Sequence, residues 1–503
     1  MWIDARQMDD GTELNTDVLV IGGGAGGLAL SMALEDAGID VLLAEAGDDT
    51  TRNGPFCEGF SQAGAHPFDI SGRRRAIGGG LTEWGGNCAL AQAEDFQPRR
   101  VRDFEGASED LLDWPFDAAA LSARTDDVEA LLHLPPGAFD VAARIREPIR
   151  LLGTRSDPFR TRRYLRADTG RGLAAMRQRL AHSGTRVLTN ARCVGLLGDG
   201  CAGKVVGALL ASGRDCRLRV AARRVVLCAG LDNAMLMMQG FPGGPDISLR
   251  RWPALGRYLH SHFLALHGFV LPGRELRSMT EAHALPLDAG GRELWQLLWR
   301  RADPLRRRET STARPTRTKP AQFDGLDPGA DLRRAEGLLN GVTWLAPVWR
   351  RHPLMSGSVR RAAPARPWRW QNPALTPMLG DLAMPRAMVL RHFVEQVPRA
   401  DARIRPGLRR DALDWPEAVV HWRMCGPEWR TIQRLAELAI TALGAAGCAL
   451  PVPVGAPDPD DPEIHRNTHP MGVPSPEQIR GTAWWMAICG CIAWKTSIFA
   501  AGQ

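Results

Sequence analysis

The clearest hydrophobic pattern in the chain lies between residues 17 and 47. An apolar run, Val18 to Ile21, leads into a glycine-rich stretch, Gly22 to Gly27, and a segment that predicts a helix follows. A second apolar run, Val41 to Leu43, leads to Glu45. Two short apolar runs joined by a glycine turn and a helix are typical of a strand–helix–strand unit. The pattern therefore predicts a dinucleotide-binding βαβ unit.

Each glycine of this turn has its own predicted role. Gly22 allows the tight turn, Gly24 lets a pyrophosphate approach the backbone, and Gly27 lets the helix pack closely on the strand. The phosphates would lie at the helix N-terminus, where unpaired N–H groups and the helix dipole favour anions. Glu45, 18 residues past Gly27, is placed to accept hydrogen bonds from a ribose. A glycine turn alone is weak evidence, but here strand, glycines, helix, strand and acid all have the required spacing.

A second glycine-rich segment runs from Arg75 to Gly86 and contains too much glycine for a regular helix or strand. A surface turn is one interpretation. The alternative is a backbone that approaches a cofactor closely, and the embedded Trp84 fits a cofactor ring lying against the main chain.

Further along, short apolar or alternating runs predict strands, and two segments predict helices. The predicted strands are Arg186 to Val194, Val205 to Leu210, Leu218 to Leu227 and Val389 to Pro398, with others around Arg403 and Val419. The predicted helices are Leu231 to Met238 and Glu428 to Ala446. From about Leu271 to Trp370 the sequence is rich in Arg and Pro, and little can be assigned there.

Length and composition limit the class of protein. With 503 residues and 44% hydrophobic content, the chain can bury a sizeable core, in two or more domains. Met1 to Asn15 is polar and acidic, so we expect no signal peptide. The ten cysteines form no CxxC pair, so we expect neither a disulfide framework nor a metal site, and a reducing cytoplasm is the default compartment.

The basic charge has an unusual make-up, since only three of the 63 basic residues are lysine. This skew indicates a GC-rich coding sequence more than a nucleic-acid partner. The basic run from Arg300 to Lys319 could bind anions, but it lacks interleaved aromatic residues. We therefore predict a solvated loop there and no nucleic-acid partner.

Several motifs together carry a resemblance to a known family. Besides the βαβ unit and the R-x-I-G-G-…-W-G-G loop, they are Trp114-Pro115, the V-V-L-C-A-G run at Val225 to Gly230, Leu255 to Leu259 with His262, Glu395 to Pro398, and His469 to Gly472. In this order they resemble the glucose-methanol-choline (GMC) oxidoreductases, over most of residues 13 to 270 and 388 to 472. The resemblance implies an α/β chain, α+β overall, with a discontinuous, Rossmann-like FAD-binding domain and a substrate domain built on an antiparallel sheet. The implied domains are 1–270 for FAD, 271–440 for substrate, and 441–503 returning to the FAD domain, with 473–503 aberrant.

The resemblance also implies which residues hold FAD. They are Gly22, Gly24, Gly27, Glu45, Gly79, Trp84, Gly85, the backbone at Val194, and Ala229. Some sugar-oxidising relatives attach FAD covalently through a His one residue before the loop Trp. That position is Glu83 here, so we expect noncovalent FAD.

By resemblance, the reaction is oxidation of a small-molecule alcohol or sugar by hydride transfer to the flavin, with an electron acceptor that the sequence does not identify. A hydroxyl proton must leave as the hydride departs, and an imidazole is suited to accept it. His469, in its H-P-M-G context, matches the family's active-site His. His262 and His465 are weaker candidates.

After Gly472 the resemblance stops, and the genetic code suggests why. Relatives continue with a pattern that begins G-V-V-D, whereas this chain has Trp484, Trp485 and Met486. Trp and Met have single codons, and reading them from the third base gives Val and Asp. Trp494 and Lys495 likewise give Glu in the shifted frame. We infer a frameshift between about Gly472 and Gly481, which replaces the family's closing segment.

Other interpretations of the C-terminal segment are weaker. Cys489 and Cys491 could form a metal or redox pair, and Thr482 to Trp494 could anchor the chain in a membrane. That apolar run is short of the roughly 20 residues that a membrane helix needs, so we expect no membrane span. Two alternative functions also remain: a catalytically inactive, truncated flavoprotein, and an NAD(P)H-dependent flavin reductase, for which the chain offers no second GxGxxG.

Overall fold

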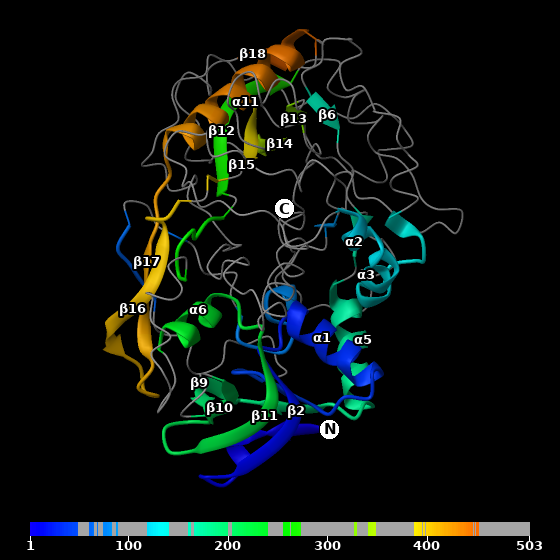
Figure 1. The fold of residues 1–503 in the computed structure, drawn as a ribbon. Helices are drawn as coiled ribbons and strands as arrows, with labels where there is room; N and C mark the ends of the chain where they lie inside the picture. Colours follow the sequence, from blue (N-terminus) through cyan, green and yellow to red (C-terminus); the bar gives the residue numbers. More distant parts are fainter. Residues whose placement is uncertain are drawn as a thin grey trace, which may run out of the picture.

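The structure is a computed structural model, and its two largest sheets have seven and four strands. The described residues are 1–48, 60–64, 68, 74–82, 87–88, 118–139, 159–161, 165–167, 169–199, 204–239, 255–261, 263–272, 326–328, 341–348, 387–394, 396–397, 399–445, 447 and 449–451. Figure 1 shows the larger sheet at the bottom of the molecule and the smaller one, with its long helix, at the top.

The larger sheet has seven strands in the order β1-β8-β3-β2-β11-β10-β9. The first five strands of this order are mutually parallel, and the last two pairings are antiparallel. The strands are β1 (Trp2–Asp4), β2 (Glu13–Ile21), β3 (Val41–Ala44), β8 (Arg186–Thr189), β9 (Arg192–Gly198), β10 (Val205–Ala211) and β11 (Arg217–Leu227). This mixed sheet confirms the predicted α/β class.

The apolar runs of β2 and β3 form the centre of this sheet because both of its faces are covered. Val18, Val20 and Leu43 pack with residues of α1 (Ala25–Asp36) and α5 (Thr169–Ala181) on one face. Leu19 and Leu42 pack on the other face, in a cluster that includes α6 (Leu231–Met238). A parallel strand buried on both faces has a continuous apolar sequence, which is the pattern that predicted these strands.

The predicted strand from Arg186 to Val194 is corrected by the structure. It is divided into β8 and β9, with Asn190 between them at φ +54°. The N–H of Asn190 donates to the carbonyl of Gly47, and that of Ala191 donates to the carbonyl of Glu45. The chain therefore bends across the end of β3, because these backbone bonds replace the continuation of the ladder.

The smaller sheet is antiparallel, in the order β14-β15-β12-β18. Its strands are β12 (Phe263–Pro272), β14 (Gly341–Val348), β15 (Ala387–Val394) and β18 (Ala449–Pro451), and α11 (Gly426–Ala445) packs against it. Gly268, at φ +87°, lies at a register shift in β12, where an added Cβ would lie 3.2 Å from the Cβ of Ala436 on α11. The domain boundaries at residues 270 and 440 remain predictions, and β12 crosses the first of them.

The remaining described elements are short, apart from one three-stranded sheet, β16-β17-β4. That sheet consists of β4 (Phe60–Gln62), β16 (Arg403–Arg410) and β17 (Pro416–His421). The others are η1 (Ala5–Gln7), η2 (Gly79–Thr82), β5 (Asn87–Cys88), α2 (Ala118–Ser122), α3 (Thr125–Leu131), β6 (Phe159–Thr161), β7 (Leu165–Arg166) and β13 (Leu326–Pro328).

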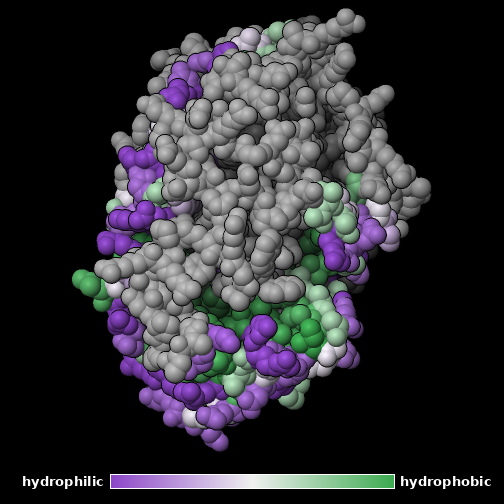
Figure 2. Space-filling view, in the orientation of Figure 1, coloured by the Kyte–Doolittle hydropathy of each residue, from purple (hydrophilic) through white to green (hydrophobic). Residues whose placement is uncertain are grey.

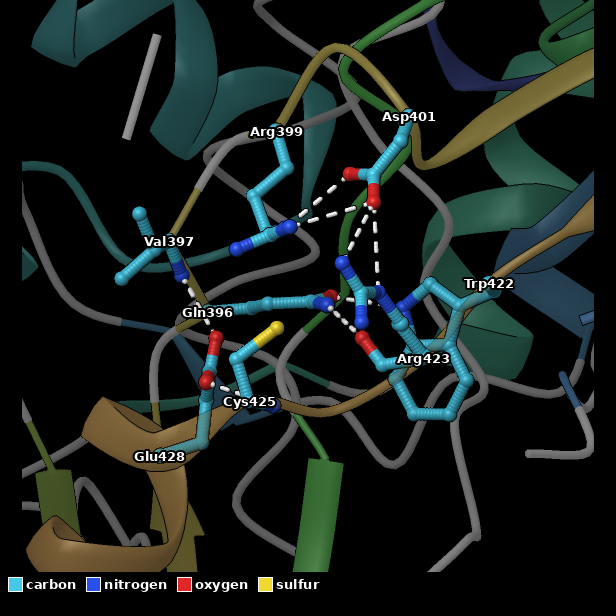
Figure 3. Close-up of polar contacts among 8 residues, drawn as sticks. All are labelled: Gln396, Val397, Arg399, Asp401, Trp422, Arg423, Cys425 and Glu428. Atoms are coloured by element: carbon cyan, nitrogen blue, oxygen red, sulfur yellow. Dashed lines mark hydrogen bonds and ion pairs between the residues drawn. The ribbon is translucent and has the colours of Figure 1, made fainter. Parts of the chain in front are cut away.

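A polar cluster, here called the joint, connects the end of β15, the end of β17 and the start of α11. It consists of the eight residues drawn in Figure 3: Gln396, Val397, Arg399, Asp401, Trp422, Arg423, Cys425 and Glu428. The buried amide of Gln396 accepts hydrogen bonds from Trp422 Nε1 (2.7 Å) and from the backbone N–H of Ser261 (3.2 Å). Its Nε2 donates to the carbonyl of Arg423 (3.0 Å).

Glu428 completes the joint from the first turn of α11. Its carboxylate accepts the backbone N–H groups of Val397 (3.1 Å) and Cys425 (2.9 Å). Burial raises the pKa of Glu428, against the lowering effect of these hydrogen bonds. The joint thus ties the smaller sheet to the three-stranded sheet through bonds that are satisfied within the chain.

In the lower part of Figure 2, hydrophilic side chains follow the rim of the molecule, and hydrophobic ones gather between that rim and the grey segments. Within the described ranges, every helix is too short or too polar to cross a membrane.

Candidate cofactor site

The site is built at the carboxyl end of β2, where the chain turns into α1. Gly22 has φ +106°, and a Cβ there would lie 2.6 Å from the carbonyl oxygen of Cys228. A Cβ on Gly27 would overlap the carbonyl oxygen of Gly22. Packing of the chain against itself therefore requires glycine at both positions, as the sequence predicted for the turn and for the helix–strand contact.

Gly24 differs from these two glycines. It precedes the first residue of α1 with φ −74° and ψ −173°, a conformation that any residue can adopt. A Cβ added there would meet nothing within 4 Å among the described residues. Space in front of a helix N-terminus is what an anionic diphosphate needs, because the backbone N–H groups and the helix dipole attract it.

Glu45 lies at the end of β3, beside the same turn, and only 6% of its surface is exposed. One carboxylate oxygen accepts the N–H of Gly23 (2.7 Å) and the other accepts the N–H of Gly47 (2.9 Å). Burial raises the pKa of Glu45, while these two hydrogen bonds and the charge of Arg75 lower it. Each carboxylate oxygen retains further acceptor capacity, which fits a ribose hydroxyl as a donor.

The second glycine-rich segment lies directly on the first. The N–H of Gly78 donates to the carbonyl of Gly23 (2.7 Å), and Gly24 and Gly78 form a parallel bridge. A Cβ on Gly79 would lie 3.0 Å from the Cα of Gly24, so the loop closely approaches the first glycine turn, whereas its predicted approach to a cofactor remains a prediction. In one detail the prediction was wrong: Gly79–Thr82 form a single turn of 3-10 helix, since the N–H of Leu81 bonds back to Gly78.

Val194 and Ala229 lie at two other strand ends of this sheet. The pairing of β9 with β10 shifts register between Cys193 and Gly195, so Val194 is the extra residue of an irregularity. Ala229 follows β11, and its N–H donates to Oδ1 of Asn233 on α6 (2.8 Å). The contacts of both residues with a cofactor remain predictions.

Sequence reasoning assigned no role to the buried charges beside this site. Arg75 is 7% exposed, and its Nη2 lies 3.7 Å from Oδ2 of Asp232 in the first turn of α6. On β9, the buried Arg192 donates to Asp411 (2.5 Å) and lies over the ring of Trp415. Burial, and then the charge of Arg75, lower the pKa of Arg192. The only sequence signal for Arg75 was its place at the start of the glycine-rich loop.

Several predicted residues fall outside the described part of the chain. They are Glu83, Trp84, Gly85, His262, His465 and His469, together with the whole segment after residue 451. Among the described histidines, His392 lies in the smaller sheet and donates from Nε2 to the carbonyl of His267 (2.9 Å). Burial lowers the pKa of His392 to about 3, so its ring stays neutral. Within the described ranges, no group of three or more His, Cys, Asp or Glu residues could hold a metal ion.

Comparison with known proteins gives one family. Residues 17–265 match the model of the family described as FAD dependent oxidoreductase. This part of the chain is similar to that family. The matched range contains the βαβ unit, the second glycine-rich segment, Glu45 and Arg75. No curated protein matches the chain.

Solved structures give more distant similarities. Pyridoxine 4-oxidase from Mesorbium loti is 18% identical, with a TM-score of 0.48 over 95% of this chain and 98% of that one. A formate oxidase is 13% identical, with a TM-score of 0.46 over 93% of this chain and 89% of that one. A variant of formate oxidase from Aspergillus oryzae RIB40 is 13% identical, with a TM-score of 0.48 over 98% and 97%. With TM-scores below 0.5, these similarities carry no argument about this chain.

FAD is the cofactor of the matched family, and the described residues fit it. A Cβ on Gly24 would meet no described atom within 4 Å, so the backbone at the start of α1 can be approached by a diphosphate, and Glu45 provides a carboxylate for a ribose. Over residues 17–265 the chain therefore resembles an FAD-dependent oxidoreductase, and its described residues fit that cofactor.

Proposed function

We propose that this chain is a GMC-type oxidoreductase that oxidises a CH–OH group of an alcohol or sugar, with noncovalent FAD as the hydride acceptor. The observation that carries the proposal is the space beside Gly24 at the start of α1, where a Cβ would meet no described atom within 4 Å, with the buried carboxylate of Glu45 next to the same turn. The order of the GMC motifs in the sequence supports the class of donor. The antiparallel sheet under α11 is the candidate substrate domain.

In this proposal each group has one task. FAD supplies the ring that accepts a hydride. The backbone at Gly24 and the first turn of α1 hold the diphosphate, and Glu45 accepts hydrogen bonds from the ribose. His469 takes the hydroxyl proton of the substrate on a ring nitrogen, because an imidazole with a near-neutral pKa is an effective base at this step. Glu83, in place of a His, leaves the flavin without a covalent link.

The proposal extends to the surroundings of the enzyme. The substrate is a small molecule, the electron acceptor is left open, and the protein works in the cytoplasm without a nucleic-acid partner. These statements rest on the composition and the cysteine pattern of the chain.

A second candidate is a catalytically inactive flavoprotein. The codons under Trp484 to Met486 favour it, because they encode Val and Asp of the family pattern in a shifted frame. The closing segment that relatives contribute to the flavin domain would then be missing. Resequencing the gene across codons 465 to 503 separates a frameshift in the organism from a sequencing error.

The test of the proposal begins with the purified chain. We expect a flavin absorbance band without added cofactor, and release of the flavin on denaturation. Glu45→Ala should weaken FAD binding by about 1 to 3 kcal/mol, the range for leaving a buried polar partner unpaired. A folded, colourless protein that takes up no FAD would contradict the proposal.

The base is tested in a frame-restored enzyme. His469→Ala should slow flavin reduction by an alcohol roughly 100-fold or more, while FAD stays bound. A normal rate in this variant would transfer the role to another residue. If the chain restored in frame binds FAD but no alcohol or sugar reduces it, the inactive flavoprotein is the better account.

A further inference from the structure

The backbone of Arg75 is fixed next to the dinucleotide turn. The N–H of Ile77 donates to the carbonyl of Asp48 (2.9 Å), and Asp48 and Ala76 form a parallel bridge. Arg177 of α5 holds the loop from the other side, because its Nη2 donates to the carbonyl of Ile77 (3.0 Å). Arg75 therefore starts from a rigid position beside the ends of β2 and β3.

The side chain of Arg75 is buried, yet it is only partly paired. Its Nη2 lies 3.7 Å from Asp232, beyond hydrogen-bond distance, and its Nη1 has no hydrogen-bond partner in the described part of the chain. Leaving a buried charged donor without an acceptor is costly, and such groups in native proteins call for an explanation. A ligand that supplies the missing acceptor is one.

The position of this donor identifies the kind of ligand. The backbone of Arg75 lies against Gly47, just after β3, and its side chain reaches Asp232 in the first turn of α6, which follows β11. In the sheet, β2 lies between β3 and β11, so Arg75 is at the carboxyl edge of these strands. In open α/β sheets, ligands bind at this edge.

Among the parts of FAD, the diphosphate best matches an unpaired guanidinium N–H. Phosphate oxygens carry negative charge and accept the charge-assisted hydrogen bonds that arginine forms most strongly. The start of α1 attracts the same anion through the helix dipole, and Gly24, which precedes α1 and has space beside its Cα, is bridged to Gly78 in the loop of Arg75. The start of α1 and the loop that carries Arg75 are thus adjacent, and both could donate hydrogen bonds to the same diphosphate.

We propose that Arg75 is a cofactor-binding residue whose Nη1 donates to the diphosphate of FAD. Its half-buried partner Asp232 then orients the guanidinium and neutralises its charge only in part. The inference rests on the FAD site described above and on no property of the substrate.

The test compares ligands that differ in the diphosphate, on the full chain freed of flavin. We measure binding of FAD, ADP and adenosine by titration calorimetry to the parent chain and to Arg75→Met, which keeps the side-chain length and removes the charge. We expect FAD and ADP to bind roughly 10- to 100-fold more weakly, the size of a charge-assisted hydrogen bond. Adenosine binding should change little. Arg75→Lys should recover part of the loss, because it retains the charge.

Two controls separate ligand binding from support of the loop. Arg177→Met removes an arginine that contacts the same loop by donating to the carbonyl of Ile77. Because this contact supports the loop, the substitution should lower thermal stability more than ADP affinity. Arg75→Met combined with Asp232→Asn removes the carboxylate that a single substitution would leave without its cation, and it replaces the single variant if that variant does not fold. ADP should bind the double variant as weakly as Arg75→Met.

Three outcomes would overturn the proposal. One is unchanged ADP and FAD affinity in a folded Arg75 variant. Another is an equal loss of adenosine and ADP affinity, which would remove the diphosphate from the contact. The third is a parent chain that binds neither FAD nor ADP. None of these readouts depends on alcohol oxidation, so they are independent of whether the proposed reaction takes place.

Discussion

Two polar regions of the molecule differ in whether the chain satisfies its own hydrogen bonds. In the joint, the carboxylates of Glu428 and Asp401 and the amide of Gln396 all bond to other groups of the chain (Figure 3). At the cofactor edge, formed by Gly22 to Gly27, Glu45 and Arg75, a Cβ on Gly24 would meet no described atom within 4 Å, and Nη1 of Arg75 has no hydrogen-bond partner among the described residues. The joint therefore has the properties of a structural connection, and the edge has those of a binding site.

Two buried arginines show the same contrast. Arg192 donates to Asp411 at 2.5 Å and lies over the ring of Trp415, so its charge is compensated within the chain. Arg75 is 3.7 Å from its nearest carboxylate and keeps a donor unpaired among the described residues. Both arginines are buried, but only the unpaired donor of Arg75 indicates a missing ligand, because buried donors in native proteins normally have an acceptor.

The largest expected effects are those of substituting Gly27 and Gly24, two glycines of the same sequence motif. Gly27→Ala should destabilise the fold by about 3 kcal/mol or more, because its Cβ would overlap the carbonyl of Gly22. Gly24→Ala should fold normally and lose FAD, because its Cβ meets no described atom within 4 Å and fills space reserved for the diphosphate. Urea unfolding and flavin content measure the two effects. Equal instability of both variants would remove the distinction between packing and ligand glycines.

The next effect concerns the satisfied arginine. Arg192→Met should lower the free energy of unfolding by about 3 to 5 kcal/mol, because it leaves Asp411 without its buried cation. ADP affinity of the folded fraction should be unchanged. The double variant with Asp411→Asn should recover part of the lost stability, as measured by urea unfolding. Lost ADP affinity with normal stability in Arg192→Met would reverse the roles given to the two arginines.

A smaller effect is expected within the joint. Gln396→Leu keeps a similar volume but leaves Trp422 Nε1 and the N–H of Ser261 without this acceptor. The free energy of unfolding should fall by about 1 to 3 kcal/mol, the penalty for unpaired buried groups. Calorimetric titration should give the same ADP affinity as in the parent chain. A stable variant would show that the joint relies on packing rather than on these bonds.

The smallest effect is a pH dependence in the joint. Hydrogen bonds from Arg399, opposed by burial, lower the pKa of Asp401 from 3.8 to about 2. The folded state therefore favours the carboxylate, and this contribution is present above about pH 4 and is lost as the pH falls towards 2. Because Asp401 is 49% exposed, we expect less than about 1 kcal/mol. Asp401→Asn should lack this slope in acid unfolding, and an identical slope would exclude Asp401 as its source.

Local patterns were sufficient for the elements that form within a few tens of residues. The apolar runs of β2 and β3, with the glycines between them, predicted the central βαβ unit, and Leu231 to Met238 was predicted with the bounds that the structure gives. These elements follow from periodicity and from glycine conformations, which depend on neighbouring residues. The break at Asn190 was missed because it depends on hydrogen bonds to Glu45 and Gly47, which lie far away in the sequence.

The sequence by itself determined where a dinucleotide turn forms, which glycines surround it, and that Glu45 follows it at the spacing for a ribose. Only the tertiary structure decided that Arg75 lies beside Asp232 and that Arg192 is paired with Asp411. It also decided that a Cβ would meet no described atom within 4 Å at Gly24 but would overlap the carbonyl oxygen of Gly22 at Gly27. The reason is physical: local geometry depends on short-range sterics, whereas the partner of a buried charge depends on which distant strands become neighbours in the sheet.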